Sequence, residues 1–249
     1  MSERRRWYTL RFEITLSGEP VDITVSLDYR SSFIHIMKKI ADASGLYDYL
    51  YGEKSHQRFA FSARLGSSFR IVGEVAKAIP PFFINFSSGD LVVFNSFLGT
   101  LTRFKKFGES FRIADASLHV SNVTVQRPYV VNRSSLECKT FSHVVLRDPK
   151  NPDLCLSPDD ADVFNETLSE YMKKKCEALT GKAPAGDLTM TPVEGKFELI
   201  RHYGGFIGGF RGFFTLSGSP DLLQFAYDFG LGQRTGQGFG LFSLVGASL

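Results

Sequence analysis

The sequence predicts an α+β protein made of two successive small domains, with a glycine-rich loop near its end. Three observations lead to this prediction. The chain has 249 residues, and a domain takes roughly 100–200, so two small domains fit. Strand and helix patterns follow each other in a similar order in both halves. Twelve of the 23 glycines lie between Gly204 and Gly246.

The composition is that of a globular chain, with 43% hydrophobic and 22% charged residues. It excludes a disordered chain, a collagen and a coiled coil. No uninterrupted apolar stretch reaches the ~18 residues of a membrane helix, and the N-terminus lacks the apolar core of a signal peptide. The three cysteines form no CxxC pair, which argues against disulfides and zinc. We therefore expect a cytoplasmic protein without membrane association, metal or cofactor.

The pattern of the first half predicts several strands and two helices. Ser31 or Ser32 can cap a helix whose apolar residues, from Phe33 to Ile40, recur at helical spacing. A second periodic run begins at Leu91, after Ser88-Gly89-Asp90. Alternating or short apolar runs predict strands at 7–17, 21–27, 59–62, 68–72, 81–87 and 111–120.

The second half repeats this pattern. Its clearest helix spans 158–179, with Ser157 as the expected N-cap and Pro158 at the first helical position. Cys176 lies on the apolar stripe of that helix and is expected in the core. A short helix at 220–229 follows Ser219. Strands are predicted at 124–131, 136–146, 196–202, 209–216 and 239–245.

Two such units are typical of a pair of ferredoxin-like (RRM-like) domains, in which strands and helices follow a split βαβ order. We place the N-terminal domain at 1–121 and the C-terminal domain at 122–249. The boundary then falls near Asn122.

The net charge of +3 conceals an asymmetry. Residues 1–125 hold 16 Lys/Arg and 12 Asp/Glu, a net of +4, whereas residues 126–249 hold 13 and 14, a net of −1. Much of the acid lies between Asp148 and Glu170. Basic surface elsewhere permits a polyanion to bind, and we expect its path to avoid the 158–179 helix.

The segment 230–240 holds five glycines in eleven positions. Such loops can cradle phosphates through backbone N–H groups, or can simply form a tight helix-to-strand turn. No Gly-Lys-Ser/Thr follows, so this is no Walker A loop. A helix precedes the loop and a strand follows it, the reverse of a dinucleotide-binding loop.

These residues also carry a family resemblance. A short helix, Gly230-Leu231-Gly232, polar residues, Gly238-Phe239-Gly240 and a last strand resemble the C-terminal signature of the RAMP proteins of CRISPR systems. The glycine-rich run 208–218 narrows the resemblance to the sixth Cas family, whose endoribonucleases cut the precursor CRISPR transcript within its repeats. The N-terminal half agrees in the order of Asp28-Tyr29, Tyr49-Leu50-Tyr51 and Phe59-Ala60-Phe61-Ser62.

The resemblance implies two tandem ferredoxin-like domains, with the glycine-rich loop at their junction and in contact with RNA. It also implies metal-independent cleavage that leaves a 2′,3′-cyclic phosphate and a 5′-hydroxyl. Such a reaction needs a base, an acid and a cation near the phosphate. Many family members place a key histidine in a Leu-His pair, where this chain has Leu50-Tyr51.

Tyrosine is a poor base at neutral pH, with an ordinary pKa near ~10. Nearby histidines and lysines can compensate for the missing imidazole. The candidate catalytic residues are therefore His35, Lys38, Lys39, Tyr51 and His56. The candidate RNA contacts are Lys54, Arg58, Arg211, Gly232, Arg234, Gly236 and Gly238, because arginine pairs well with phosphate and the glycines lie in the matched loop.

The expected partner is CRISPR repeat RNA, both as the precursor transcript and as the guide RNA, and the protein is expected to be a monomer or a homodimer. Three hypotheses follow for its function. The first is the repeat endoribonuclease. The second is a relative that binds the repeat without cutting it, because the Leu-His pair is missing. The third is a structural RAMP subunit that joins other subunits of an effector complex.

Overall fold

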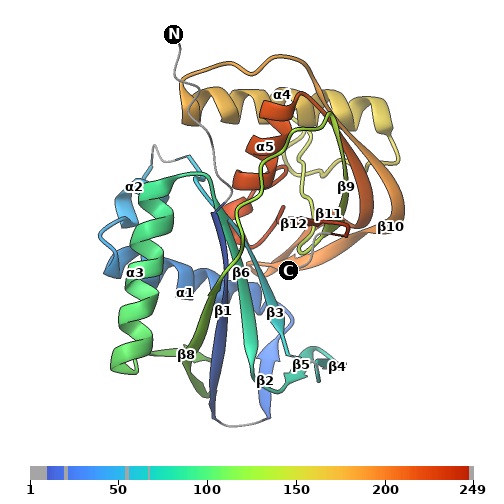
Figure 1. Cartoon of the computed structure of the whole chain (residues 1–249). Helices are drawn as coiled ribbons and strands as arrows, with labels where there is room; N and C mark the ends of the chain where they lie inside the picture. The colour runs from blue at the N-terminus through green and yellow to red at the C-terminus, as the bar shows by residue number, and fades with distance from the viewer. Residues whose placement is uncertain (1–9, 20–21, 54–55, 67, 247–249) are drawn as a thin grey trace.

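The computed structural model describes residues 10–19, 22–53, 56–66 and 68–246. Two α+β domains lie one above the other, with the N-terminal domain below in Figure 1. Each has an antiparallel sheet with helices against it. The predicted first strand began at Trp7, and residues 7–9 lie outside the described part of the chain.

The N-terminal sheet has the ferredoxin-like arrangement, because two helices separate strands that pair out of sequence order. Its order is β3-β6-β1-β8-β7. A small second sheet, β2-β5-β4, stands beside it (Figure 1). The elements are β1 (Leu10–Glu19), β2 (Ile23–Ser26), α1 (Arg30–Ala43), α2 (Tyr47–Tyr51), β3 (Ala60–Leu65), β4 (Arg70–Val72), β5 (Val75–Ala78), β6 (Phe82–Ser88), α3 (Leu91–Phe107), β7 (Ser110–Ile113) and β8 (Ala116–Val125).

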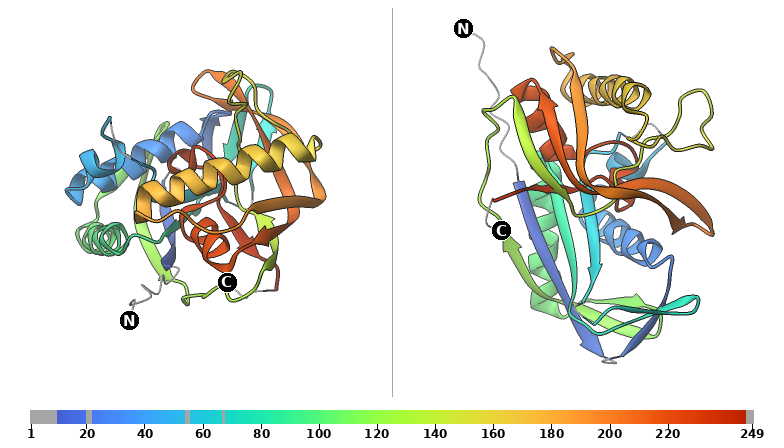
Figure 2. Two further views of the ribbon diagram at one scale, coloured as in Figure 1. Left: turned by 90° about the horizontal axis from the view of Figure 1, so that it is seen from above. Right: turned by 90° about the vertical axis from the view of Figure 1, so that its right-hand side faces the viewer.

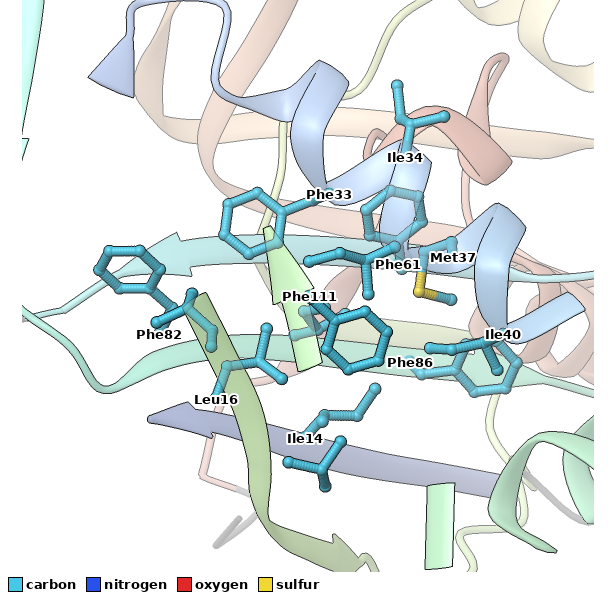
Figure 3. Close-up of a cluster of buried hydrophobic side chains, with 14 of the residues drawn as sticks. Ile14, Leu16, Phe33, Ile34, Met37, Ile40, Phe61, Phe82, Phe86 and Phe111 are labelled. Carbon is cyan, nitrogen blue, oxygen red and sulfur yellow. The ribbon is translucent and has the colours of Figure 1, made fainter. Parts of the chain in front are cut away.

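The core of this domain explains much of the phenylalanine content. Phe33, Met37 and Ile40 of α1 face Ile14 and Phe86 of the sheet, and all five are buried (Figure 3). The apolar spacing of α1 therefore presents one continuous stripe to the sheet, as predicted. Burying side chains of this size contributes roughly 1.5–3 kcal/mol each.

The C-terminal sheet repeats the same arrangement in the order β10-β11-β9-β12. Strands β10 and β11 form a long hairpin, in orange in Figure 2, that extends past the other two strands. The elements are β9 (Ser135–Thr140), α4 (Ala161–Thr180), β10 (Leu188–His202), β11 (Gly205–Gly218), α5 (Pro220–Phe229), the 3₁₀ turn η1 (Thr235–Gln237) and β12 (Phe242–Leu244). Two tandem ferredoxin-like domains are thus confirmed.

Local sequence predicted most elements but missed several ends. Ser219 caps α5 as predicted, and its Oγ accepts from the N–H of Leu222 at 3.4 Å. The N-cap of α4 is Asp160 rather than Ser157, so Pro158 precedes the helix. The predicted strand 111–120 is two strands, because Ala114 adopts a φ of 53° in the turn between them.

The N-terminal sheet also continues past the predicted domain boundary at 121. Residues Asn122 to Val125 of β8 pair with Thr15 to Phe12 of β1. The predicted strand 124–131 therefore ends at Val125, and an extended segment links the domains from 126 to 134. The end of β8 is set by its pairing with β1, which is distant in sequence, so local sequence patterns do not predict it. The short helix α2 was not predicted.

The two domains meet at one end of the N-terminal sheet, where β3 begins, β6 ends and β1 begins. Ala60, Ser87 and Arg11 form one row across these three strands. Helix α5 and the glycine-rich loop of the C-terminal domain lie against this row, as α5 does above β1 and β6 in Figure 1. The junction therefore brings together the parts of both halves that carry the family resemblance.

Candidate nucleic-acid interface

The glycine-rich loop is folded tightly against the N-terminal domain. Gly230 has a φ of +81°, and a Cβ there would lie 2.7 Å from the Cβ of Ala60. A Cβ on Gly240 would lie 2.2 Å from the carbonyl oxygen of Leu231. Since an L side chain fits neither the backbone angle nor the space, glycine is required at both positions.

Most of the loop's donors are already used inside the protein. The N–H groups of Leu231 and Gly240 donate to Gly240 and His143, each at 2.8 Å, and that of Gln233 donates to Val145 at 2.8 Å. The three loop glycines predicted to bind RNA, Gly232, Gly236 and Gly238, are buried. Gly232 and Gly238 shape the loop through their positive φ, and direct contact of the three glycines with RNA stays a prediction.

A buried hydrogen-bond chain fastens this loop to the segment before β3. Lys175 of α4 donates through Nζ to the Phe229 carbonyl at 3.0 Å and to Thr235 Oγ1 at 3.2 Å. Thr235 Oγ1 lies 2.9 Å from the Phe59 carbonyl oxygen and 3.2 Å from Gln57 Oε1. Because lysine only donates, the threonine proton goes to an oxygen of the N-terminal domain. The chain thus joins α4, the loop and residues 57–59.

Beside the loop lies a cluster of incompletely bonded polar groups, which we call the junction cluster: Asp28, Tyr51 and His202. Asp28 Oδ1, Tyr51 Oη and His202 Nδ1 are buried, and each lacks a hydrogen-bond partner within the described part of the chain. They come from the start of α1, from α2 and from the β10–β11 hairpin. Buried polar atoms normally have partners, so each of these atoms marks a group that a bound ligand or water can satisfy.

The β10–β11 turn connects the members of the junction cluster. The N–H of Gly204 donates to Asp28 Oδ2 at 3.4 Å. Tyr203 lies close enough to Tyr51 and Asp28 to act electrostatically on both. Burial raises the pKa of Tyr51 and lowers the pKa of His202, so both are neutral at pH 7.

Arginines surround the junction cluster. The charges of Arg30 and Arg234 each help to lower the pKa of His202, and Arg147 is near enough to affect Arg234 in the same way. Burial, together with the charge of Arg147, lowers the pKa of Arg234, yet an arginine stays charged at neutral pH. Arg234 adopts a left-handed φ of 57° and donates to Gln237 Oε1 at 2.7 Å. Three cations beside one carboxylate favour a polyanionic ligand.

Exposed aromatic rings adjoin the same region. Tyr203 and Phe206 at the hairpin turn are 57% and 65% exposed, and Arg201 lies over the Phe206 ring at 5.6 Å. On α2, Tyr47 and Tyr49 are also exposed. Exposed rings beside arginines are suited to stacking with unpaired bases.

The structure divides the predicted catalytic residues between two places. Lys38 lies beside Tyr51, with its Nζ 5.5 Å from the ring centroid. Tyr51 in turn contacts Phe59, three residues after the exposed His56. His35 and Lys39 instead line a cavity of about 570 Å³ against β7 and β8. There Lys39 pairs with Glu109 at 2.6 Å.

The residues predicted to contact RNA lie in different surroundings. Arg58 is bound to Asp90 at 3.2 Å and lies over the Tyr49 ring at 4.4 Å. Arg211 is exposed on β11, opposite Lys196 of β10. Lys54 lies outside the described residues. Among the predicted site residues, Tyr51 belongs to the junction cluster, and Lys38 and Arg234 are charges beside it.

Sequence reasoning missed Asp28, Arg30 and His202 as site residues. Asp28 was part of the motif that carries the resemblance, and His202 precedes a Tyr-Gly-Gly turn. Their meeting depends on how the β10–β11 hairpin reaches α1, so only the tertiary structure reveals it. In the described residues, no helix is long and apolar enough to span a bilayer, and no group of three His, Cys, Asp or Glu side chains is arranged to hold a metal ion.

Two tandem ferredoxin-like domains, with a glycine-rich loop fastened at their junction, are the arrangement that the resemblance to RAMP proteins implied. Residues 126–244 match the family described as CRISPR associated protein Cas6, C-terminal. No curated protein matches the chain. The C-terminal half of the chain thus matches the Cas6 family, and the whole chain shares its fold with solved Cas6 structures.

Solved structures share the fold over almost the whole chain. One, from work on a Cas6-related gene from Pyrococcus furiosus, has a TM-score of 0.83 and 20% identity over 96% of this chain and 100% of that chain. A RAMP protein described as binding different RNA substrates has a TM-score of 0.80 and 20% identity over 95% and 99%. A Cas6 product complex has a TM-score of 0.65 and 16% identity over 96% and 100%.

Proposed function

We propose that this protein binds CRISPR repeat RNA at the domain junction and cuts the precursor transcript within its repeats, leaving a 2′,3′-cyclic phosphate and a 5′-hydroxyl. The observation that carries the proposal is the junction cluster, where buried polar atoms without partners lie among arginines and exposed tyrosines. Relatives of the same fold are described as binding RNA and as a product complex.

Cleavage of this kind needs a group that takes the proton of the 2′-hydroxyl. Tyr51 cannot supply it at neutral pH, because burial raises its pKa and keeps the hydroxyl protonated. His56 is exposed and lies just before Gln57, which the glycine-rich loop holds through Thr235 and Gly236. We therefore assign the general base to His56 and charge stabilisation to Lys38, beside Tyr51.

The second candidate function is repeat binding without cleavage. It is favoured by one specific observation: the position where the family resemblance expects histidine holds Tyr51, whose hydroxyl is buried. His35, the other predicted base, lies in the cavity beside β7 and β8, away from the contacts of Tyr51. In this function the junction would bind the repeat and leave its backbone intact.

A cleavage assay on a repeat RNA, run in excess EDTA, tests the two functions. The wild type should cut the RNA without added metal, and His56→Ala should lower the single-turnover rate ~100-fold or more, which is the usual effect of losing a general base. His119→Ala is the matched control, because His119 is an exposed histidine on β8. His35→Ala should behave like this control.

Four outcomes would contradict the proposal. If the wild type bound repeat RNA without cutting it, repeat binding without cleavage would replace the endoribonuclease function. Unchanged cleavage by His56→Ala would remove His56 as the base, and loss of cutting in EDTA would remove the metal-independent reaction. Failure to bind any repeat RNA would overturn both functions.

A further inference from the structure

A chain of three side chains crosses the domain junction and ends at Arg30. Glu198 Oε1, on β10, lies 2.7 Å from His143 Nε2, in the segment between β9 and α4. On the other side of the ring, His143 Nδ1 lies 3.5 Å from Arg30 Nη2, at the start of α1. The chain therefore links the β10–β11 hairpin of the C-terminal domain to the first helix of the N-terminal domain.

The chemistry of the three groups decides which atoms donate. A guanidinium has only donors, so His143 Nδ1 accepts from Arg30. A neutral imidazole then carries its proton on Nε2, which donates to the Glu198 carboxylate. Burial lowers the pKa of His143 to about 4, so the ring is neutral at pH 7. Glu198 thus holds the ring in the tautomer that can bind Arg30.

The imidazole of His143 is fixed in place by the elements around it. Its side chain is only 5% exposed. The carbonyl of His143 accepts from the N–H of Gly240 at 2.8 Å, and a Cβ on Gly209, of β11, would lie 3.0 Å from the His143 Cβ. Because β11 and the glycine-rich loop pack against this residue, its ring can hold a guanidinium in one position.

Arg30 keeps most of its donors for a ligand. It is partly exposed, and its guanidinium carbon lies 5.2 Å from the ring centroid of Tyr29 and 5.5 Å from that of Phe239. Within the described residues no carboxylate pairs with this guanidinium, and its hydrogen-bond acceptor is His143 Nδ1. A guanidinium has five N–H donors, so several remain for an anion, and phosphate oxygens are the anions that RNA offers.

We propose that Arg30 contacts a phosphate of the bound RNA, and that His143 and Glu198 are positioning residues that orient its guanidinium. This proposal rests on the RNA binding proposed above and adds residues to which that function gave no role. The imidazole holds one N–H of the planar fork and leaves the others to pair with phosphate oxygens. Glu198 should then affect RNA binding only through Arg30.

Equilibrium binding of repeat RNA at several KCl concentrations tests the phosphate contact. Each contact that is lost lowers the slope of log K against log salt by ~0.7 for a single strand. Arg30→Gln should therefore reduce the slope by about this amount and weaken binding ~10-fold at low salt. Arg112→Gln is the matched control and should change neither, because Arg112 is exposed on β7, at the opposite edge of the sheet from β3.

Two substitutions of Glu198 test the positioning role. Glu198→Ala and Glu198→Gln both remove the negative charge, but only glutamine keeps an acceptor for the N–H of His143. The alanine variant should therefore bind ~3-fold or more weakly than the glutamine variant. In the Arg30→Gln background the two should bind equally. Glu194→Ala, at an exposed position of the same strand, is the matched control and should bind like the wild type.

The outcomes separate this inference from the proposed function. An unchanged salt slope in Arg30→Gln would overturn the phosphate contact. Equal binding by the two Glu198 variants, or a difference that persists without Arg30, would overturn the positioning role. If Glu198→Ala fails to fold by circular dichroism, His143→Leu takes its place and should weaken binding only where Arg30 is present. Failure of the wild type to bind repeat RNA would instead overturn the proposed function.

Discussion

The guanidinium of Arg11, in β1, lies over the ring of Tyr227, in α5, with its carbon 3.5 Å from the ring centroid. The same group donates to the carbonyls of Tyr227 and Phe242, the latter at 2.6 Å, and to Ser87 Oγ at 3.2 Å. One buried side chain of the N-terminal domain thus satisfies two carbonyls of the C-terminal domain. Because these bonds cross the junction, Arg11 couples the folding of one domain to that of the other.

Replacing Arg11 with methionine should therefore destabilise the whole protein. The two carbonyls and Ser87 would lose their donor in a buried place, and hydrogen bonds to charged groups contribute about 1.5–3 kcal/mol each. We expect a loss of about 3 kcal/mol or more in the free energy of unfolding, measured by urea denaturation. Arg112→Met, which removes an exposed arginine on β7, should cost less than about 1 kcal/mol. Equal stability of the two variants would show that Arg11 does not hold the junction.

Lys175 should make stability depend on pH. Burial lowers the pKa of its ammonium to about 7, whereas the unfolded chain has the ordinary value of 10.5. Between these values the unfolded state binds more protons, so the stability of the wild type rises with pH, and the penalty is complete below pH 7. Relative to Lys175→Met, the wild type should gain roughly 1 kcal/mol per pH unit from pH 7 to 9. A difference that is independent of pH would contradict the lowered pKa.

Two glycines of the same loop should respond differently to alanine. Gly230 has a φ of +81° and no room for a Cβ beside Ala60, so Gly230→Ala should lower stability by about 2 kcal/mol or more. At Gly236 the nearest atom to a Cβ lies 3.6 Å away, in Phe59, so Gly236→Ala should stay within about 0.5 kcal/mol of the wild type. Thermal unfolding of both variants measures this. A loss at Gly230 as small as the one expected at Gly236 would mean that the loop does not need glycine at position 230.

Tyr51 offers a test of the missing histidine. Tyr51→His would place an imidazole where the family resemblance expects one, and burial would keep it neutral and able to act as a base. We expect the single-turnover cleavage rate of a repeat RNA to rise ~10-fold or more. Tyr51→Phe, the matched control, removes the hydroxyl without adding a base and should not raise the rate. No gain with histidine would show that the base acts from elsewhere, as His56 would.

The resemblance and the local patterns predicted the class of fold because both depend on neighbouring residues. Ser219 and Pro220 start α5 by bonds within one turn, and the stripe from Phe33 to Ile40 follows helical spacing. The family resemblance implied that the glycine-rich loop lies where the two domains meet, and the loop does contact the N-terminal domain. The physical cause of this position, however, is contact with Ala60, 170 residues earlier in the chain, which the glycine pattern cannot specify.

Tertiary structure alone decided which residues share a site. His35 and Lys38 are three positions apart on α1, yet one lines the cavity beside β7 and β8 and the other lies against Tyr51. Asp28 and His202 are far apart in sequence and meet because the β10–β11 turn reaches the start of α1. Spacing along the chain sets the face of a helix or strand, whereas the partner of that face depends on how two domains pack. The sequence by itself thus determined the two domains and their loop, and packing determined the site between them.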